Sequence, residues 1–322
     1  MHTLLLIKTS SLGDVVHAFP VITDINRHRP ELAIDWVVEE SFSALPRLHP
    51  GVRRVIPVAM RRWRKSLHSR STRHDIRQLR HTLQLTAYDA SLDLQGLIKS
   101  ALLSTLGPRP RWGYDRQSIR EPLASSFYDK RFHVSKNQHA VARNRQLAGL
   151  ALGYTPEESV NYGLPPHLPR PLGLPTQPYM VFLHGTSRAN KEWPEPLWVE
   201  LGQRIAQQGM TVLLPGGSTL ERERAQRLAG QIPRAQALPS LDLTTLSGVL
   251  AHAHGVVGVD TGLSHLATAL QRPVVALYTA TRPEATGVYG SFRAVNLGGI
   301  GQCPTVEAVV TELERLDAWK AE

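Results

Sequence analysis

Cysteine is almost absent from this sequence. Its 322 residues include a single cysteine, Cys303, so the chain can form no internal disulfide and has no second thiol for a metal site. Small secreted proteins held together by disulfides are therefore excluded, and a reducing compartment is expected. Because 42% of the residues are hydrophobic, the chain can bury a large core, and its length predicts about two domains.

Long hydrophobic runs are missing too. No stretch approaches the roughly 18 consecutive apolar residues that span a bilayer. The opening run at 4–7 ends at Lys8 and is too short for the core of a signal peptide, so export by that route is not expected. Any attachment to a membrane is expected to be peripheral.

Acidic residues are scarce in the first half of the chain. Residues 1–160 hold 24 basic and 14 acidic residues, which accounts for the whole net charge of +10, whereas 161–322 hold 13 of each. Residues 53–80 contain ten basic residues and one acid, Asp75. This imbalance favours an anionic ligand or membrane surface over an ordinary solvated face. Nucleic acid is the weaker alternative, because Trp63 is the only aromatic residue there and no RNA-recognition or zinc-finger signature occurs.

Short apolar runs and amphipathic segments alternate along both halves, which predicts parallel sheets covered by helices. In the first half we expect strands at 3–8, 34–38, 52–58, 88–94 and 131–134, with helices at 96–106 and 139–150. In the second half we expect strands at 179–183, 211–215, 255–259 and 274–278, with helices at 195–208, 220–230, 243–253, 262–270 and 305–320.

Proline separates the two halves. Seven prolines fall within residues 155–178, where neither a strand nor a helix can continue. We therefore expect α/β domains at 1–160 and 179–322 joined by a linker at 161–178, with the C-terminal helix as a candidate to pack back on the first domain. Two doubly wound, Rossmann-like domains would place ligands at the carboxyl ends of their strands, facing a central cleft.

The loop at 8–14 follows the first predicted strand and opens a helix. Its small residues, including Ser10 and Gly13, allow a ligand to approach the backbone closely. Asp14 has two interpretations that position alone does not separate. It is either the N-cap of the helix or a general base that takes a proton from a hydroxyl group.

Two loops of the second half have a similar pattern. At 258–265 a strand ends in Asp260 and a glycine-containing turn that opens a helix, whose free amides would hold a pyrophosphate without a metal. At 184–194 the hydroxyls of Thr186 and Ser187, together with Lys191, would clamp a phosphate and stabilise a leaving group. Helix capping and a solvated loop are the respective structural alternatives.

Metal-binding signatures are not found. The sequence has no phosphate-binding Gly-x-x-x-x-Gly-Lys-Ser/Thr loop, no His-Glu-x-x-His and no Asp-x-Asp for a metal bridged to a nucleotide diphosphate. A bound divalent ion is not expected.

Six segments in one order resemble a known family over nearly the full length, the heptosyltransferases of lipopolysaccharide inner-core assembly in glycosyltransferase family 9. The segments are KTSSLGDVVH at 8–17, DWVVEE at 35–40, RRVIPV at 53–58 leading into RRWRK at 61–65, QGLIKS at 95–100, REPLAS at 120–125 and VDTGLSH at 259–265. The first segment and the RRWRK cluster are similar to the enzymes that add the first heptose rather than the second.

The resemblance implies a GT-B fold and an inverting, metal-independent transfer. The implied donor is ADP-L-glycero-β-D-manno-heptose, bound by the C-terminal half, and no cofactor is implied. The implied acceptor is the inner Kdo residue of Kdo2-lipid A, bound by the N-terminal half. We expect a monomer, peripheral on the cytoplasmic side of the bacterial inner membrane, that meets an anionic membrane surface and no nucleic acid.

The resemblance also assigns residues. Asp14 would be the catalytic base, and Lys191 would stabilise the departing ADP. The implied donor site comprises Ser10, Gly13, Thr186, Ser187, Lys191, Glu221, Leu241, Asp260, Thr261, Gly262 and His265. The implied acceptor site comprises Arg61, Arg62, Arg64, Lys65 and Arg120. Residues 279–281 depart from the family, because Thr-Ala-Thr replaces the Gly-Pro-Thr that is common in relatives.

Two alternatives are kept open. Another family 9 transferase, such as the second heptosyltransferase, would use an acceptor that already carries heptose. A module that binds an anionic membrane or nucleic acid would use the basic segment without catalysis.

Overall fold

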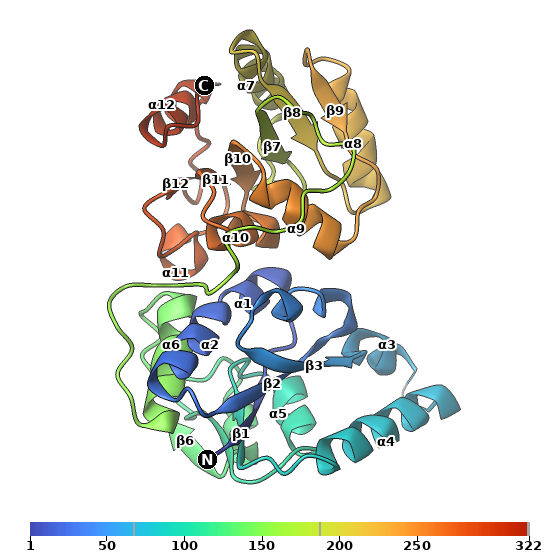
Figure 1. Ribbon diagram of the computed structural model, residues 1–322, viewed down its shortest axis with the longest axis vertical. Helices are drawn as coiled ribbons and strands as arrows, with labels where there is room; N and C mark the ends of the chain where they lie inside the picture. The colour runs from blue at the N-terminus through green and yellow to red at the C-terminus, as the bar shows by residue number, and fades with distance from the viewer. Residues whose placement is uncertain (67, 187, 321–322) are drawn as a thin grey trace. The chain divides into compact units, whose positions relative to one another are not determined.

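The chain divides into two compact units, each built on one parallel sheet (Figure 1). The computed structural model describes residues 1–66, 68–186 and 188–320. Unit 1 runs Met1–Leu164 and unit 2 begins at Pro165, so the boundary falls inside the proline-rich segment.

Unit 1 contains six parallel strands in the order β3-β2-β1-β4-β5-β6. The strands are β1 Thr3–Ile7, β2 Ala33–Glu39, β3 Val52–Val58, β4 Ala90–Asp93, β5 Arg111–Tyr114 and β6 Lys130–Phe132. The chain builds outward from β1 in one direction and then returns to add β4 on its other side. The switch point between β1 and β4 is where sheets of this kind bind ligands.

The helices of unit 1 connect these strands. They are α1 Leu12–Val16, α2 Phe19–His28, α3 Met60–Lys65, α4 Arg70–Gln84, α5 Ile98–Ser104 and α6 Ala140–Leu152, with 3-10 turns η1 Glu40–Phe42, η2 Pro46–Leu48 and η3 Pro122–Phe127. One core cluster packs Trp63 of α3 and Leu79 and Leu83 of α4 against Val37 and Ile56 of the sheet. The buried side chains of α3 and α4 thus fix both helices to one edge of the sheet.

Unit 2 repeats this topology with the order β12-β11-β10-β7-β8-β9, again all parallel. The strands are β7 Tyr179–Leu183, β8 Thr211–Leu214, β9 Ala235–Ala237, β10 Gly255–Val259, β11 Val274–Tyr278 and β12 Ala294–Gly298. Its switch point lies between β7 and β10. The central strands β7, β10 and β11 are buried along their whole length.

The helices of unit 2 are η4 Ala189–Lys191, α7 Glu195–Gln207, α8 Thr219–Ala229, α9 Leu243–Ala251, α10 Gly262–Ala269, α11 Pro283–Thr286 and α12 Val306–Arg315. The C-terminal α12 buries Val309 and Leu313 in the same cluster as Trp193 and Trp198. The indole Nε1 of Trp193 also donates to the carbonyl of Pro304, 2.8 Å away. The apolar face of α12 therefore belongs to the core of unit 2.

The predicted α/β architecture with two parallel sheets is confirmed. Short strands were missed: β5 follows Pro108 and Pro110, and β9 and β12 are only partly buried, so none of them has a clear apolar run. Among the described residues, no helix is both long enough and apolar enough to span a membrane.

Candidate functional site

The switch point of unit 1 joins the loops that follow β1 and β4. The side-chain carbonyl of Gln95 accepts hydrogen bonds from the amides of Thr9 and Ser10, each at 3.1 Å. Lys99 Nζ donates to Ser10 Oγ at 2.9 Å. These bonds fix the backbone of the first loop, where Ser10 and Gly13 are buried.

Asp14 lies at the start of α1, and Ser11, rather than Asp14, is the N-cap. Asp14 Oδ2 accepts from the Ser11 amide at 2.8 Å and from Ser11 Oγ at 3.0 Å. Its Oδ1 lies 3.9 Å from Lys8 Nζ. Because the side chain is still 31% exposed, the carboxylate is held in place and also accessible to a substrate.

Lys8 lies beneath this loop and is buried. Its Nζ donates to the carbonyl of Leu94 at 2.9 Å. Burial lowers the pKa of Lys8, while the carboxylates of Asp14 and Asp93 act in the opposite direction and Arg143 and Arg120 add to the lowering. Arg120, a predicted acceptor residue, thus belongs to the electrostatic surroundings of the Asp14 loop.

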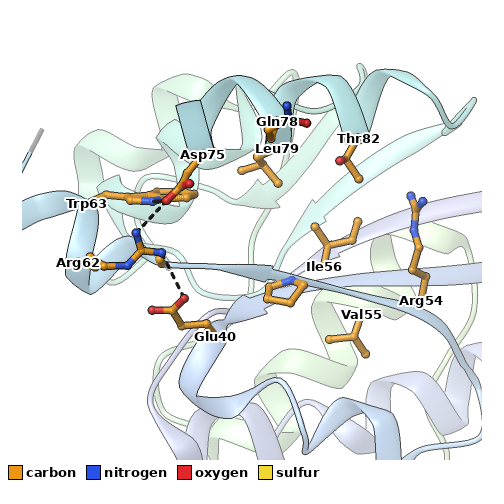
Figure 2. Close-up of a pocket in the computed structure, with 12 residues that line it drawn as sticks. Glu40, Arg54, Val55, Ile56, Arg62, Trp63, Asp75, Gln78, Leu79 and Thr82 are labelled. Carbon is orange, nitrogen blue, oxygen red and sulfur yellow. Dashed lines mark hydrogen bonds and ion pairs between the residues drawn. The ribbon is translucent and has the colours of Figure 1, made fainter. Parts of the chain in front are cut away.

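The predicted acceptor residues of α3 have different surroundings. The guanidinium of Arg61 lies 5.1 Å from the centre of the Phe42 ring. Arg62 pairs with Asp75 at 2.9 Å and with Glu40 at 3.4 Å, as Figure 2 shows. Arg64 and Lys65 are exposed. Of the four, Arg62 is therefore already neutralised within the protein.

A cavity of about 320 Å³ lies beside α3. Figure 2 shows Ile56 of β3 facing Leu79 and Thr82 of α4, with Arg62 and Asp75 at one end. Asp75 Oδ2 also accepts from the indole Nε1 of Trp63 at 3.0 Å. The polar groups at this end thus satisfy one another, and the network joins α3 to α4.

The switch point of unit 2 is organised around Asp260, which follows β10. Its Oδ2 accepts from Lys191 Nζ and from Thr281 Oγ1, both at 2.6 Å. Its backbone carbonyl accepts from Thr186 Oγ1 at 3.2 Å. The structure therefore brings together three predicted residues, Thr186, Lys191 and Asp260. It adds Thr281, which the sequence indicated only as the last residue of the segment 279–281, where the first two residues differ from the family pattern.

Helix α10 begins directly after Asp260. Thr261 is its N-cap and Gly262 its first residue, and among the described residues no side chain caps its first turn. His265 is buried within α10, where Ser264 Oγ donates to the carbonyl of Val259 at 2.9 Å. The first-turn amides lie next to the Lys191–Asp260 pair, an arrangement suited to a phosphate group.

Glu221 lies in the first turn of α8, where it forms a capping box with the N-cap Ser218. Its Oε2 accepts from the amides of Gly217 and Ser218, at 2.8 and 2.9 Å. A Cβ at Gly185 would lie only 2.7 Å from Glu221 Oε1, so this carboxylate packs directly on the loop after β7. A glycine at 185 is needed for this close approach.

Leu241 and Ser187 are the two remaining predicted donor residues. Leu241 is partly buried and precedes Asp242, the N-cap of α9. Ser187 lies outside the described residues. His184 directly follows β7, and burial lowers its pKa to about 4, so its imidazole is neutral at pH 7. Within the described ranges, no group of three or more His, Cys, Asp or Glu side chains could hold a metal.

Comparisons with known proteins match residues in both units. The sequence model of "Glycosyltransferase family 9 (heptosyltransferase)" matches residues 76–314. Lipopolysaccharide heptosyltransferase 1 of Pseudomonas aeruginosa is 48% identical over 301 residues, which are 93% of this chain and 84% of that protein.

Solved structures give the same result. The structure titled E. coli heptosyltransferase WaaC with ADP matches with a TM-score of 0.91 and 42% identity, covering 98% of this chain and 99% of that one. WaaC with ADP-2-deoxy-2-fluoro heptose matches with a TM-score of 0.87 and 42% identity, covering 97% and 99%.

Proposed function

Because the chain belongs to glycosyltransferase family 9, the heptosyltransferases, we propose that it transfers heptose from ADP-L-glycero-β-D-manno-heptose to the inner Kdo of Kdo2-lipid A. The transfer inverts the anomeric carbon and needs no metal. One observation carries this proposal: each unit has a polar site at its switch point. Unit 1 holds a fixed, accessible carboxylate, and unit 2 holds a lysine beside a helix N-terminus.

The donor binds to unit 2. The amides of Thr261 and Gly262 and the ammonium of Lys191 bind the pyrophosphate. A nucleotide-linked donor is supported by the similarity to WaaC, which has been solved with ADP and with ADP-2-deoxy-2-fluoro heptose. We assign Glu221 the role of accepting hydrogen bonds from the ribose hydroxyls, and Leu241 that of offering methyl groups to the adenine. As the bond to the sugar breaks, Lys191 and the helix N-terminus stabilise the charge that develops on ADP.

Asp14 acts as the general base. It removes the proton from a Kdo hydroxyl, whose oxygen attacks the anomeric carbon as the bond from that carbon to the phosphate oxygen breaks. ADP leaves with the electron pair, and this single displacement converts a β-linked donor into an α-linked product. Since Ser11 occupies Oδ2 of Asp14, we assign the transferred proton to Oδ1, on the side of Lys8.

The acceptor binds to unit 1. Arg61, Arg64 and Lys65 of α3 supply positive charge for its carboxylates and phosphates, and Arg120 supplies charge near Asp14. We assign Arg62 a different role, because its bonds to Glu40 and Asp75 hold α3 in place. The enzyme then works as a peripheral protein on the cytoplasmic side of the inner membrane, where the acceptor is embedded.

Replacing Asp14 with Asn tests the chemistry. The amide cannot take the proton, so we expect kcat for heptose transfer to fall by about 10²–10⁴ while the Kd for ADP stays within twofold of the original protein. Asp129→Asn removes a carboxylate from the far edge of the sheet and serves as the control. A near-normal kcat for Asp14→Asn would refute the role of the base, whereas equal losses of transfer and ADP binding would indicate a structural role.

A further inference from the structure

The ten basic residues of 53–80 fall into two classes in the structure. Three are balanced by carboxylates. Arg53 and Arg54 both donate to the buried Asp35, at 2.8–2.9 Å and 3.1 Å. Arg62 pairs with Glu40 and with Asp75, the only acid of the segment. Asp35, Glu40 and Asp75 thus balance the charge of these three arginines.

The remaining positive charge lies on α3 and, separately, on α4. Arg70, Arg73, Arg77 and Arg80 of α4 are exposed, and within the described part of the chain none of them forms an ion pair with a carboxylate. Asp75 is turned toward the cavity, where Arg62 and Trp63 donate to it (Figure 2). It therefore does not neutralise the outer side of α4.

Helical spacing puts these arginines on one face. Positions 70, 73, 74, 77, 80 and 81 recur at intervals of three and four, so Arg70, Arg73, His74, Arg77, Arg80 and His81 lie side by side. The opposite side of α4 buries Leu79 and Leu83 in the core of unit 1. Helix α4 therefore has one exposed face without acidic residues, and its opposite face is fixed by packing in the core of unit 1.

An apolar side chain extends the same face. Leu85, the C-cap of α4, keeps helical geometry and follows His81 by four residues, and 73% of its surface is exposed. Residues 70–85 contain no Phe, Trp or Tyr on which a base could stack. Single-stranded nucleic acid is usually bound by aromatic stacking in addition to charge, whereas anionic bilayers attract clustered basic residues beside apolar ones.

We propose that this face of α4, comprising Arg70, Arg73, His74, Arg77, Arg80, His81 and Leu85, docks the protein on a bilayer of anionic lipids. The surface is separate from the acceptor-binding residues of α3. The guanidinium groups contact headgroup phosphates and Leu85 enters the interface, so that α4 lies flat on the membrane. This inference rests on the proposed function, because only a membrane-embedded acceptor gives such docking a purpose.

Binding to vesicles that contain neither donor nor acceptor tests the docking surface. The probe is a vesicle of equal parts phosphatidylglycerol and phosphatidylcholine, with pure phosphatidylcholine as its control. Each basic residue near an anionic surface contributes about fivefold to partitioning, so Arg77→Gln/Arg80→Gln should bind about 30-fold more weakly. Arg234→Gln/Arg315→Gln removes the same charge from unit 2 and should bind like the original protein.

Two further measurements separate the docking surface from the active site. Leu85→Ser should weaken the vesicle binding that survives at high salt, because its contribution is apolar. Heptose transfer to a deacylated, water-soluble Kdo2 acceptor should keep its KM within twofold in the Arg77→Gln/Arg80→Gln variant.

The result that supports the proposal is loss of vesicle binding with unchanged transfer to the soluble acceptor. Unchanged vesicle binding in the variant, no preference of the original protein for anionic vesicles, or a raised KM for the soluble acceptor would each overturn it. Tighter α4-dependent binding to single-stranded RNA than to vesicles would overturn it in favour of a nucleic acid. If the proposed transfer fails while vesicle binding follows α4, the proposed function alone is wrong.

Discussion

Thr281 shows how one residue of unit 2 completes the site. Its hydroxyl donates to Asp260 Oδ2 on the same oxygen that meets Lys191. The sequence indicated Thr186, Lys191 and Asp260 because each follows a predicted central strand. It could not indicate Thr281, since the contact depends on how the loop after β11 folds back toward β10.

Replacing Thr281 with Val removes this donor and keeps the shape of the side chain. One hydrogen bond to a carboxylate contributes about 1.5 kcal/mol or more, so we expect kcat/KM for ADP-heptose to fall roughly tenfold. Thr281→Ser keeps the hydroxyl and should retain most of the activity. Steady-state kinetics at a fixed acceptor concentration make the comparison, and equal activities of the Val and Ser variants would show that the bond does not matter.

His49 couples the stability of unit 1 to pH. It is buried, its Nδ1 accepts from the amide of Gly51 at 3.0 Å, and burial lowers its pKa to about 4. An unfolded histidine has a pKa near 6.5, so between about pH 6.5 and 4 the unfolded chain binds a proton that the folded one does not. The free energy of unfolding must therefore decrease as the pH falls through this window.

The expected loss at His49 is about 2 kcal/mol between pH 7.5 and 5. Urea denaturation at the two pH values measures it, and His49→Gln should show a decrease smaller by about that amount. His184 in unit 2 changes in the same direction and is left in place in both proteins. An identical pH dependence in His49→Gln would contradict the assignment.

At the scale of elements, the sequence predicted what depends on local patterns. Strands β7, β10 and β11 have continuous buried runs, and they were found at the predicted residues. The sequence alone could not predict which carboxylates pair with the arginines of the basic segment 53–80. Asp35 and Glu40, which balance Arg53, Arg54 and Arg62, come from β2 and the turn after it, and only the fold brings them close.

Helix α3 offers a test of the acceptor assignment. Arg61→Ala/Arg64→Ala/Lys65→Ala removes three exposed positive charges without touching the Arg62 network. Charge-assisted contacts to carboxylates and phosphates are lost, so we expect the acceptor KM to rise at least tenfold while the Kd for ADP is unchanged. As a control, Arg227→Ala/Arg234→Ala/Arg315→Ala removes the same charge from unit 2. Equal weakening of ADP binding and of acceptor binding would contradict the assignment of the acceptor to unit 1 and of the donor to unit 2.

At the scale of the whole molecule, charge and fold divide at the same place. Residues 161–164 carry no charge, so unit 1 holds the entire excess of +10 and unit 2 is neutral. The sequence predicted this asymmetry and the parallel sheet of each unit. It could not predict which basic residues pair with carboxylates inside the protein and which lie exposed on α3 or on the outer face of α4.

The acceptor on which the enzyme acts tests the account most directly. Single-turnover transfer from ADP-heptose is measured, in the presence of EDTA, with Kdo2-lipid A and with its heptosylated product as alternative acceptors. We predict rapid formation of an α-linked heptose on Kdo2-lipid A and little or no transfer to the heptosylated lipid. Transfer only to the heptosylated acceptor, or none to either until a divalent metal is restored, would contradict the account.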